Sequence, residues 1–208
     1  MNGVLETAVH VQAFCDSRGW RSCFIGGIAV QRWGEPRVTR DVHLSLLAGF
    51  GREDGYIDAL MEAYTARIGN AREFALTRRV LLLQSKDGVG IDISLAAIPF
   101  EQGVVARAST FDFGAGLAIR TCSAEDLVVL KLFASRPLDI RDAEGVAVRQ
   151  GDRLTGTISR TNWHRSPRRR RSRRSCKSTP SCAVASVPSR PQRLEGCGGE
   201  MDGMLKRS

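Results

Sequence analysis

The chain has 208 residues, with 31 lysines and arginines against 22 aspartates and glutamates, and a formal net charge of +9. This length allows one domain with a hydrophobic core and an appendage, and no apolar run reaches the roughly 18 residues of a membrane-spanning helix. The N-terminus has no basic segment followed by an apolar one, so we expect no signal peptide. The six cysteines form no CxxC pair and are interpreted as scattered thiols of a cytoplasmic protein.

The predicted elements alternate along the chain. Helical spacing of apolar residues predicts a helix over residues 4–17, and a second, short helix over 28–33 follows two glycines. A longer amphipathic helix is expected over residues 54–68. Ser123 with Asp126 three residues later approximates a capping box and predicts the start of another helix. Strands are predicted at residues 21–25, 42–47, 80–84, 90–98 and 117–121, and a last helix at 138–149.

Short strands interleaved with helices favour an α+β or mixed α/β fold. The expected fold has a short mixed β-sheet flanked by helices and occupies residues 1–150.

The basic excess lies in the C-terminal segment. From Gly151 onward there are 14 of the 31 basic and 4 of the 22 acidic residues, so this segment has a net charge of +10 and positions 1–150 have −1. The segment holds four of the seven prolines, many serines and an arginine run at 168–171. This composition predicts a disordered tail over residues 151–208.

Three side chains are candidates for a metal site. Residues i and i+2 of a strand share a face, so Asp41 and His43 point the same way. Asp92 lies on a second predicted strand within GVGIDISL. If the two strands are neighbours, these side chains converge, as in sites for phosphoryl or nucleotidyl transfer that hold one or two Mg²⁺ ions.

Residues around this cluster suit phosphate groups. Gly26 and Gly27 precede a short helix, whose N-terminal N–H groups can bind phosphate oxygens. Arg37, Thr39 and Arg40 flank the acidic strand. Singly, each feature has an ordinary alternative: a glycine pair is usually a tight turn, a strand-end aspartate is often a turn residue, and an isolated histidine is usually no metal ligand.

The order of these motifs resembles the nucleotidyltransferase superfamily with a DNA-polymerase-β-like core, and within it the AbiEii-type toxin family. The family pattern is G-G/S, R-x-T-x-D-x-D and a later aspartate on a strand. The matching positions are Gly26, Gly27, Arg37, Thr39, Asp41 and Asp92, with Lys131, Ala134, Arg136, Asp139 and Asp142 matching a downstream K-x-x-A-x-R-x-x-D-x-x-D segment.

The resemblance implies transfer of a nucleoside monophosphate from an NTP to a hydroxyl group, with release of pyrophosphate. The implied acceptor is an RNA such as tRNA or a protein side chain, and a cognate antitoxin is expected. Asp41 would hold the metal, Asp92 would align or deprotonate the acceptor, and Lys131 would bind the triphosphate. The alternative for Lys131 is a solvated helix face, and Asp139 and Asp142 have the spacing of simple ion-pair partners.

His43 departs from the pattern, because it occupies the position of the second aspartate. An imidazole is a poor ligand for Mg²⁺ and favours Mn²⁺ or Zn²⁺. The expected cofactor is therefore Mg²⁺, with Mn²⁺ as the alternative, and His43 is expected to impair activity. A catalytically inactive NTP- or RNA-binding module is the competing hypothesis, with the arginine cluster of the tail as its nucleic-acid contact.

The tail is the second departure. All periodicity stops after Leu154, and a shift of reading frame at this point is compatible with an acidic, helix-like continuation. We interpret the tail as a frameshift product in preference to an evolved basic arm. A decayed gene product is a further alternative.

Overall fold

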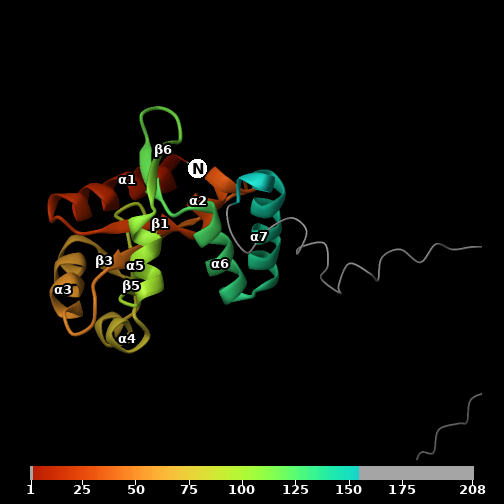
Figure 1. Cartoon of the computed structure of the whole chain (residues 1–208). Helices are drawn as coiled ribbons and strands as arrows, with labels where there is room; N and C mark the ends of the chain where they lie inside the picture. The colour runs from red at the N-terminus through yellow and green to blue at the C-terminus, as the bar shows by residue number, and fades with distance from the viewer. Residues whose placement is uncertain (1, 155–208) are drawn as a thin grey trace, which may run out of the picture. The chain divides into compact units, whose positions relative to one another are not determined.

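The computed structural model describes residues 2–154 (Figure 1), so the predictions for residues 155–208 lie outside the described residues. Helices and strands alternate in this part of the chain. The helices are α1 (Asn2–Ser17), α2 (Gly26–Trp33), α3 (Glu53–Ala63), α4 (Ala71–Arg78), α5 (Pro99–Ala106), α6 (Ala124–Ala134) and α7 (Pro137–Gln150), with a 3₁₀ turn at Gly151–Arg153. The strands are β1 (Ser22–Ile25), β2 (Asp41–Leu47), β3 (Thr65–Ala66), β4 (Val80–Gln84), β5 (Gly90–Ala96), β6 (Ser109–Asp112) and β7 (Ala118–Thr121).

The strands form one mixed sheet in the order β3-β4-β5-β2-β1-β7-β6. The central pair, β2 and β5, is parallel, and β1 is antiparallel to β2 but parallel to β7. The β3–β4, β4–β5 and β6–β7 pairs are antiparallel. This arrangement confirms the predicted mixed sheet of short strands flanked by helices.

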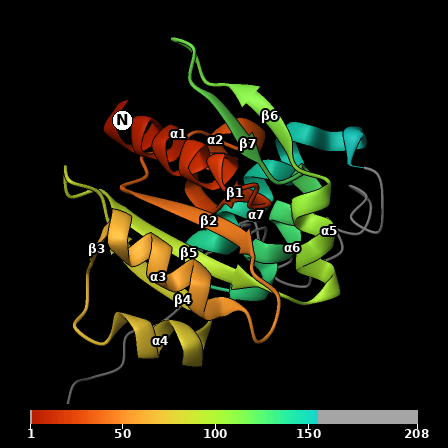
Figure 2. The same ribbon diagram turned by 90° about the vertical axis from the view of Figure 1, so that its left-hand side faces the viewer.

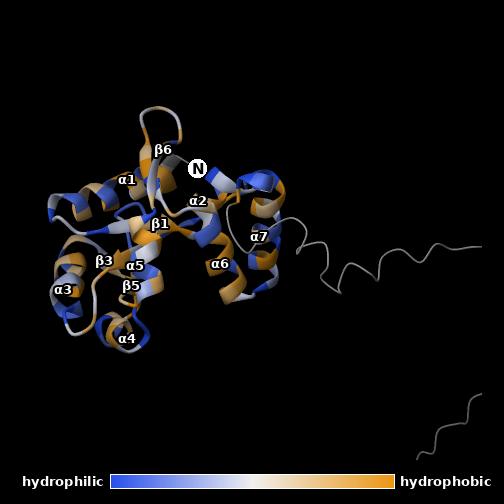
Figure 3. Ribbon diagram, viewed as in Figure 1, coloured by the Kyte–Doolittle hydropathy of each residue, from blue (hydrophilic) through white to orange (hydrophobic). Residues whose placement is uncertain are grey.

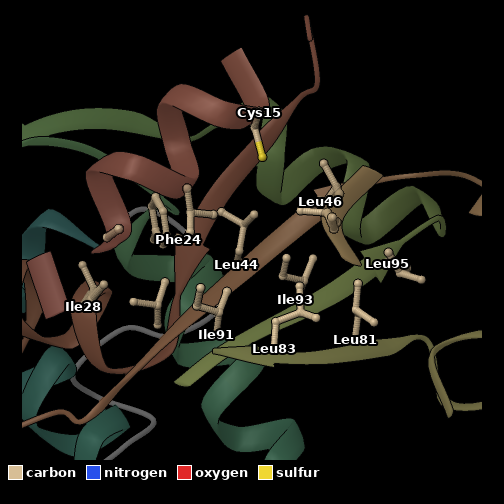
Figure 4. Packing of buried hydrophobic residues seen from close by; sticks show 14 of the residues in the cluster. Cys15, Phe24, Ile28, Leu44, Leu46, Leu81, Leu83, Ile91, Ile93 and Leu95 are labelled. Atoms are coloured by element: carbon tan, nitrogen blue, oxygen red, sulfur yellow. The ribbon is translucent and has the colours of Figure 1, made fainter. Parts of the chain in front are cut away.

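Two hydrophobic clusters cover opposite faces of the sheet. The larger one joins residues of α1, α3 and α4 to the inward side chains of the central strands, including Phe24, Leu44, Ile91 and Ile93 (Figure 4). The smaller one joins Cys23 and Cys122 to residues of α2, α5, α6 and α7. Figure 2 shows α1 and α3 on one side of the sheet, with α5, α6 and α7 on the other.

Alternation along the central strands explains which side chains are left for a site. In β2, Val42 and Leu44 are fully buried, whereas Asp41 and His43, which alternate with them, are only partly covered. The same alternation places Asp92 of β5 between buried Ile91 and Ile93. The apolar residues of these strands belong to the larger hydrophobic cluster, and the polar residues point to the opposite face of the sheet. Figure 3 shows the hydropathy of each residue along the ribbon, with hydrophobic segments in orange.

The predicted helix over residues 54–68 is wrong at its C-terminal end. Helix α3 ends at Ala63, and Tyr64 has an extended backbone (φ −131°, ψ 151°). The apolar spacing continues to Tyr64 because this side chain packs edge-on against Phe14, with ring centroids 5.6 Å apart. Residues 65–66 then pair with β4 as β3.

Other differences concern elements that the sequence did not predict. Helices α4 and α5 and strand β6 were not expected, and the predicted strand 90–98 ends at Ala96. Helix α5 begins after Ala97 and Ile98, whose N–H groups both donate to Glu101. The predicted cap of α6 is confirmed, since Ser123 Oγ accepts a hydrogen bond from the Asp126 N–H at 3.1 Å.

The described part of the chain extends past the predicted boundary at residue 150. Leu154, after the 3₁₀ turn, is buried in the smaller hydrophobic cluster. Cys15, Cys23 and Cys122 are free, buried thiols. Of the helices within residues 2–154, none combines the length and the apolar character that crossing a membrane requires.

Candidate metal and nucleotide site

The site is built on the register of the two central strands. In the parallel β2–β5 pair, His43 lies opposite Asp92, and Asp41 lies opposite Gly90. Residues opposite each other in adjacent strands point to the same face of a sheet. The register therefore brings Asp41, His43 and Asp92 together, although 49 positions separate the second from the third in the sequence.

The three side chains meet around the imidazole of His43. Its Nε2 lies 3.0 Å from Asp41 Oδ2 and 3.6 Å from Asp92 Oδ2. One ligand atom from each residue lies within 4.8 Å of the other two. The side chains of Asp41, His43 and Asp92 are 43%, 31% and 26% exposed, so the cluster is open to a ligand from solvent.

Local contacts keep Asp41 ionised. Partial burial raises its pKa, but hydrogen bonding and charge from His43 and a hydrogen bond from Thr39 outweigh burial, so the net pKa is lowered. The Thr39 hydroxyl lies 3.3 Å from Asp41 Oδ1. Asp41 is therefore a carboxylate at neutral pH, as a cation ligand must be.

The glycine pair makes room for the side chains of the R-x-T-x-D-x-H segment. Gly26 has φ +65°, a left-handed conformation that favours glycine. A Cβ at Gly26 would lie 2.9 Å from His43 Nδ1, and a Cβ at Gly27 would lie 2.4 Å from Thr39 Oγ1. The two glycines thus let His43 and the buried Thr39 pack directly against the first turn of α2.

Arg67, which the sequence did not single out, contacts the cluster from the edge of the sheet. Its guanidinium forms an ion pair with Asp92 Oδ1. Arg67 lies inside the segment predicted as helix 54–68, so no sequence signal placed it beside Asp92. It follows β3, and its N–H donates to the carbonyl of Leu82 in β4 at 3.0 Å.

A second group of charged side chains connects the R-x-T-x-D segment to α6 and α7. We call it the charge cluster; its members are Arg37, Lys131, Arg136, Asp139 and Asp142. Lys131 Nζ lies 2.8 Å from Asp139 Oδ1 and 2.8 Å from Asp142 Oδ2. Arg37 makes two hydrogen bonds to Asp142, at 2.8 and 2.9 Å, and Arg136 Nε lies 2.5 Å from Asp139 Oδ2.

The electrostatics of the charge cluster follow from this pairing. Burial raises the pKa of Asp139 and Asp142, but their basic partners outweigh it and lower both values. The hydrogen bond to Asp142 raises the pKa of Arg37, and the negative charge of Asp41 contributes in the same direction. The negative charge of Asp41 also raises the pKa of Arg136. The charge cluster and Asp41 therefore interact electrostatically.

This geometry bears on the predicted phosphate ligands. Lys131 is 7% exposed and its ammonium group is engaged by two carboxylates, so it does not lie on a solvated helix face. Arg37 is held by Asp142. Their roles toward a nucleotide remain predictions. Arg136, by contrast, has a side chain that is 72% exposed.

The donor set fits a divalent cation. Two carboxylates and one imidazole supply hard oxygen ligands and one nitrogen ligand, and the nitrogen shifts the preference from Mg²⁺ toward Mn²⁺ or Zn²⁺. Two hollows of about 310 and 240 Å³ lie elsewhere, one lined by Trp20 and Arg120 and the other by Tyr64 and Gln84. Neither of these two hollows is lined by Asp41, His43 or Asp92.

Solved structures that resemble this chain include the following three. The chain is similar to the solution structure of the antibiotic-resistance factor ANT(2'')-Ia, with a TM-score of 0.51 and 19% identity over 74% of this chain and 88% of that chain. A crystal structure of ANT(2'')-Ia in complex with adenylyl-2''-tobramycin gives a TM-score of 0.48 at 19% identity, covering 74% and 92% of the two chains. Lincosamide antibiotic adenylyltransferase LnuA, lincomycin-bound, gives 0.46 at 14% identity, covering 66% and 92%.

Comparisons with protein-family models and with curated proteins give no match. The likeness to ANT(2'')-Ia supports the predicted nucleotidyltransferase fold over the share of the chain that it covers and extends no further. The predicted AbiEii-type family stays a prediction.

Proposed function

We propose that the protein is a metal-dependent nucleotidyltransferase that moves a nucleoside monophosphate from an NTP to a hydroxyl group. One observation carries this proposal: Asp41, His43 and Asp92 converge on one face of the sheet, next to the Gly26-Gly27 corner at the start of α2. The fold that the chain shares with ANT(2'')-Ia is consistent with it.

Each residue has a task that follows from its place. Asp41, ionised and held by Thr39, and Asp92 provide carboxylate oxygens, and His43 provides Nε2, for a divalent cation. A bound cation supplies charge neutralisation for the triphosphate and lowers the barrier to attack on the α-phosphorus. Nε2 of His43 donates to Asp41 in this structure and must give up that hydrogen bond to act as a ligand.

The transfer step requires a base for the acceptor. Oδ2 of Asp92 faces the cluster, so we assign to Asp92 the task of aligning the acceptor hydroxyl and taking its proton. The acceptor oxygen forms a bond to the α-phosphorus, the bond to the β-phosphate oxygen breaks, and pyrophosphate leaves. The N–H groups in the first turn of α2 are the proposed phosphate contacts.

The acceptor and the biological setting are proposed from the resemblance in sequence. The family pattern favours a toxin-type enzyme with an RNA such as tRNA, or a protein side chain, as acceptor, and with a cognate antitoxin. Mg²⁺ is the expected cofactor of the family, whereas His43 favours Mn²⁺ at this site.

A transfer assay tests the proposal. The full chain is incubated with each α-³²P-labelled NTP, Mg²⁺ or Mn²⁺, and either total tRNA or a protein extract. Label in the acceptor that is lost in Asp41→Asn supports the enzyme. Retention of NTP on the protein without transfer supports the competing binding module, which the replacement of a carboxylate by His43 favours. If the protein shows neither transfer nor NTP binding, both the enzyme and the binding module are refuted.

A further inference from the structure

We infer that Arg67 is a positioning residue that fixes the carboxylate of Asp92 for cation binding. The inference rests on the proposed function, because it assumes that Asp92 is a ligand of the cation. Nothing in the sequence pattern assigns a role to this arginine.

The two oxygens of Asp92 have different partners. Oδ1 pairs with the guanidinium of Arg67, and Oδ2 lies 3.6 Å from His43 Nε2, on the side of the metal candidates. The guanidinium thus holds one oxygen and leaves the other directed at the shared site. Arg67 is therefore a partner of the candidate ligand Asp92.

A backbone hydrogen bond fixes the position from which the Arg67 side chain extends. Its N–H donates to the carbonyl of Leu82, and Leu82 is the register partner of Asp92 in the β4–β5 pair. Arg67, directly after β3, thus lies in one row with Leu82 of β4 and Asp92 of β5. The direction from which Arg67 approaches is set by the sheet and not by a free loop.

The lack of a side chain at Gly90 leaves room for the guanidinium of Arg67. A Cβ at Gly90 would lie 3.0 Å from Nη1 of Arg67 and 3.4 Å from Cβ of Asp41. The arginine side chain therefore crosses the bare backbone of β5 next to Asp41, two residues before the carboxylate that it pairs with. Its side chain is 31% exposed, so packing restricts it on the sheet side only.

Carboxylates that ligate a metal are themselves held by hydrogen-bond partners, and loss of such a partner typically weakens metal affinity or activity by about 10- to 100-fold. Removal of the guanidinium has an opposing effect, because it removes a positive charge that repels a cation. Since Arg67 is partly exposed, solvent screens this repulsion, and we expect the loss of orientation to dominate.

The experiment measures binding of Mn²⁺ alone, from the electron paramagnetic resonance signal of free Mn²⁺, to the full chain without NTP. Arg67→Ala is expected to raise the Kd about tenfold, and Arg67→Lys, which keeps a charged donor, is expected to recover part of the loss. The matched control is Arg72→Ala, which removes an arginine paired with Asp54 and Asp58 on the opposite side of the sheet and should leave the Kd unchanged. Thermal unfolding of each variant shows that the fold is intact.

The outcomes separate the two proposals. An equal or lower Kd for Arg67→Ala, with wild-type binding intact, overturns the role of Arg67 alone. The role of Arg67 is also overturned if Arg67→Lys binds Mn²⁺ as weakly as Arg67→Ala does. If the wild-type protein binds no Mn²⁺ at all, the metal site and the proposed function fall together with the inference.

Discussion

Replacement of Lys131 by methionine removes the central cation of the charge cluster and keeps a side chain of similar length. Asp139 and Asp142 would each lose one of two basic partners, and both side chains are only 3% exposed. Removing one partner of a buried ion pair typically costs about 3–5 kcal/mol, because the remaining charge stays buried. Here Arg37 and Arg136 still neutralise the two carboxylates, so we expect the lower end, about 3 kcal/mol.

The measurement is urea unfolding of the full chain, followed by circular dichroism. In thermal unfolding of the same variant, a loss of about 3 kcal/mol corresponds, for a folded domain of this size, to a fall in Tm of roughly 6–12 °C. Arg72→Met is the matched control, since Arg72 also pairs with two carboxylates but in an exposed setting. It should cost no more than about 1 kcal/mol.

The same variant tests the prediction that Lys131 binds the triphosphate. If Lys131→Met unfolds within about 1 kcal/mol of the wild type while its KM for NTP rises sharply, then the lysine contacts nucleotide and the structural reasoning is refuted. A large loss of stability with an unchanged KM in the folded fraction is the result that we expect.

Three further predictions concern the site and its support. His43→Asp restores the carboxylate of the family pattern and should raise transfer with Mg²⁺ at least about tenfold, by analogy with the loss of one transition-state contact; equal rates would show that position 43 does not contact the cation. Gly27→Ala should cost about 1–3 kcal/mol, because its Cβ meets Thr39 and the core would be overpacked. Gly55→Ala, in a helix with no neighbour within 4 Å, should be neutral or stabilising, and equal effects of the two alanines in urea unfolding would contradict the contact with Thr39. Because the pKa values of the two carboxylates in the charge cluster are lowered by folding, their contribution to stability is complete above the usual carboxyl pKa of about 3.9 and is lost as the pH falls through the lower folded values. Acid titration of the free energy of unfolding should therefore show a steep decline below about pH 4, which a Lys131→Met chain would show less steeply.

Alternation along β2 was predictable from the residues alone, and it places Asp41 and His43 on one face of the strand, whereas Asp92 joins them only through the pairing of β2 with β5. Alternation is a property of neighbouring residues, because the pleat of a strand turns successive side chains to opposite faces. The start of α6 was predictable for the same reason, since a serine cap acts on the N–H three residues later.

The pairing of the charged side chains depends on how the elements pack. Lys131 was open to interpretation as a phosphate ligand or a solvated side chain, and only the packing of α6 against α7 placed it between two carboxylates. Arg67 was hidden because the apolar spacing through Tyr64 indicated a continuous helix, whereas the chain leaves the helix at Tyr64 and residues 65–66 pair with β4, so that the Arg67 side chain reaches Asp92 of β5. Ion pairs between distant segments depend on strand order and helix packing, and neither can be predicted from local patterns of residues.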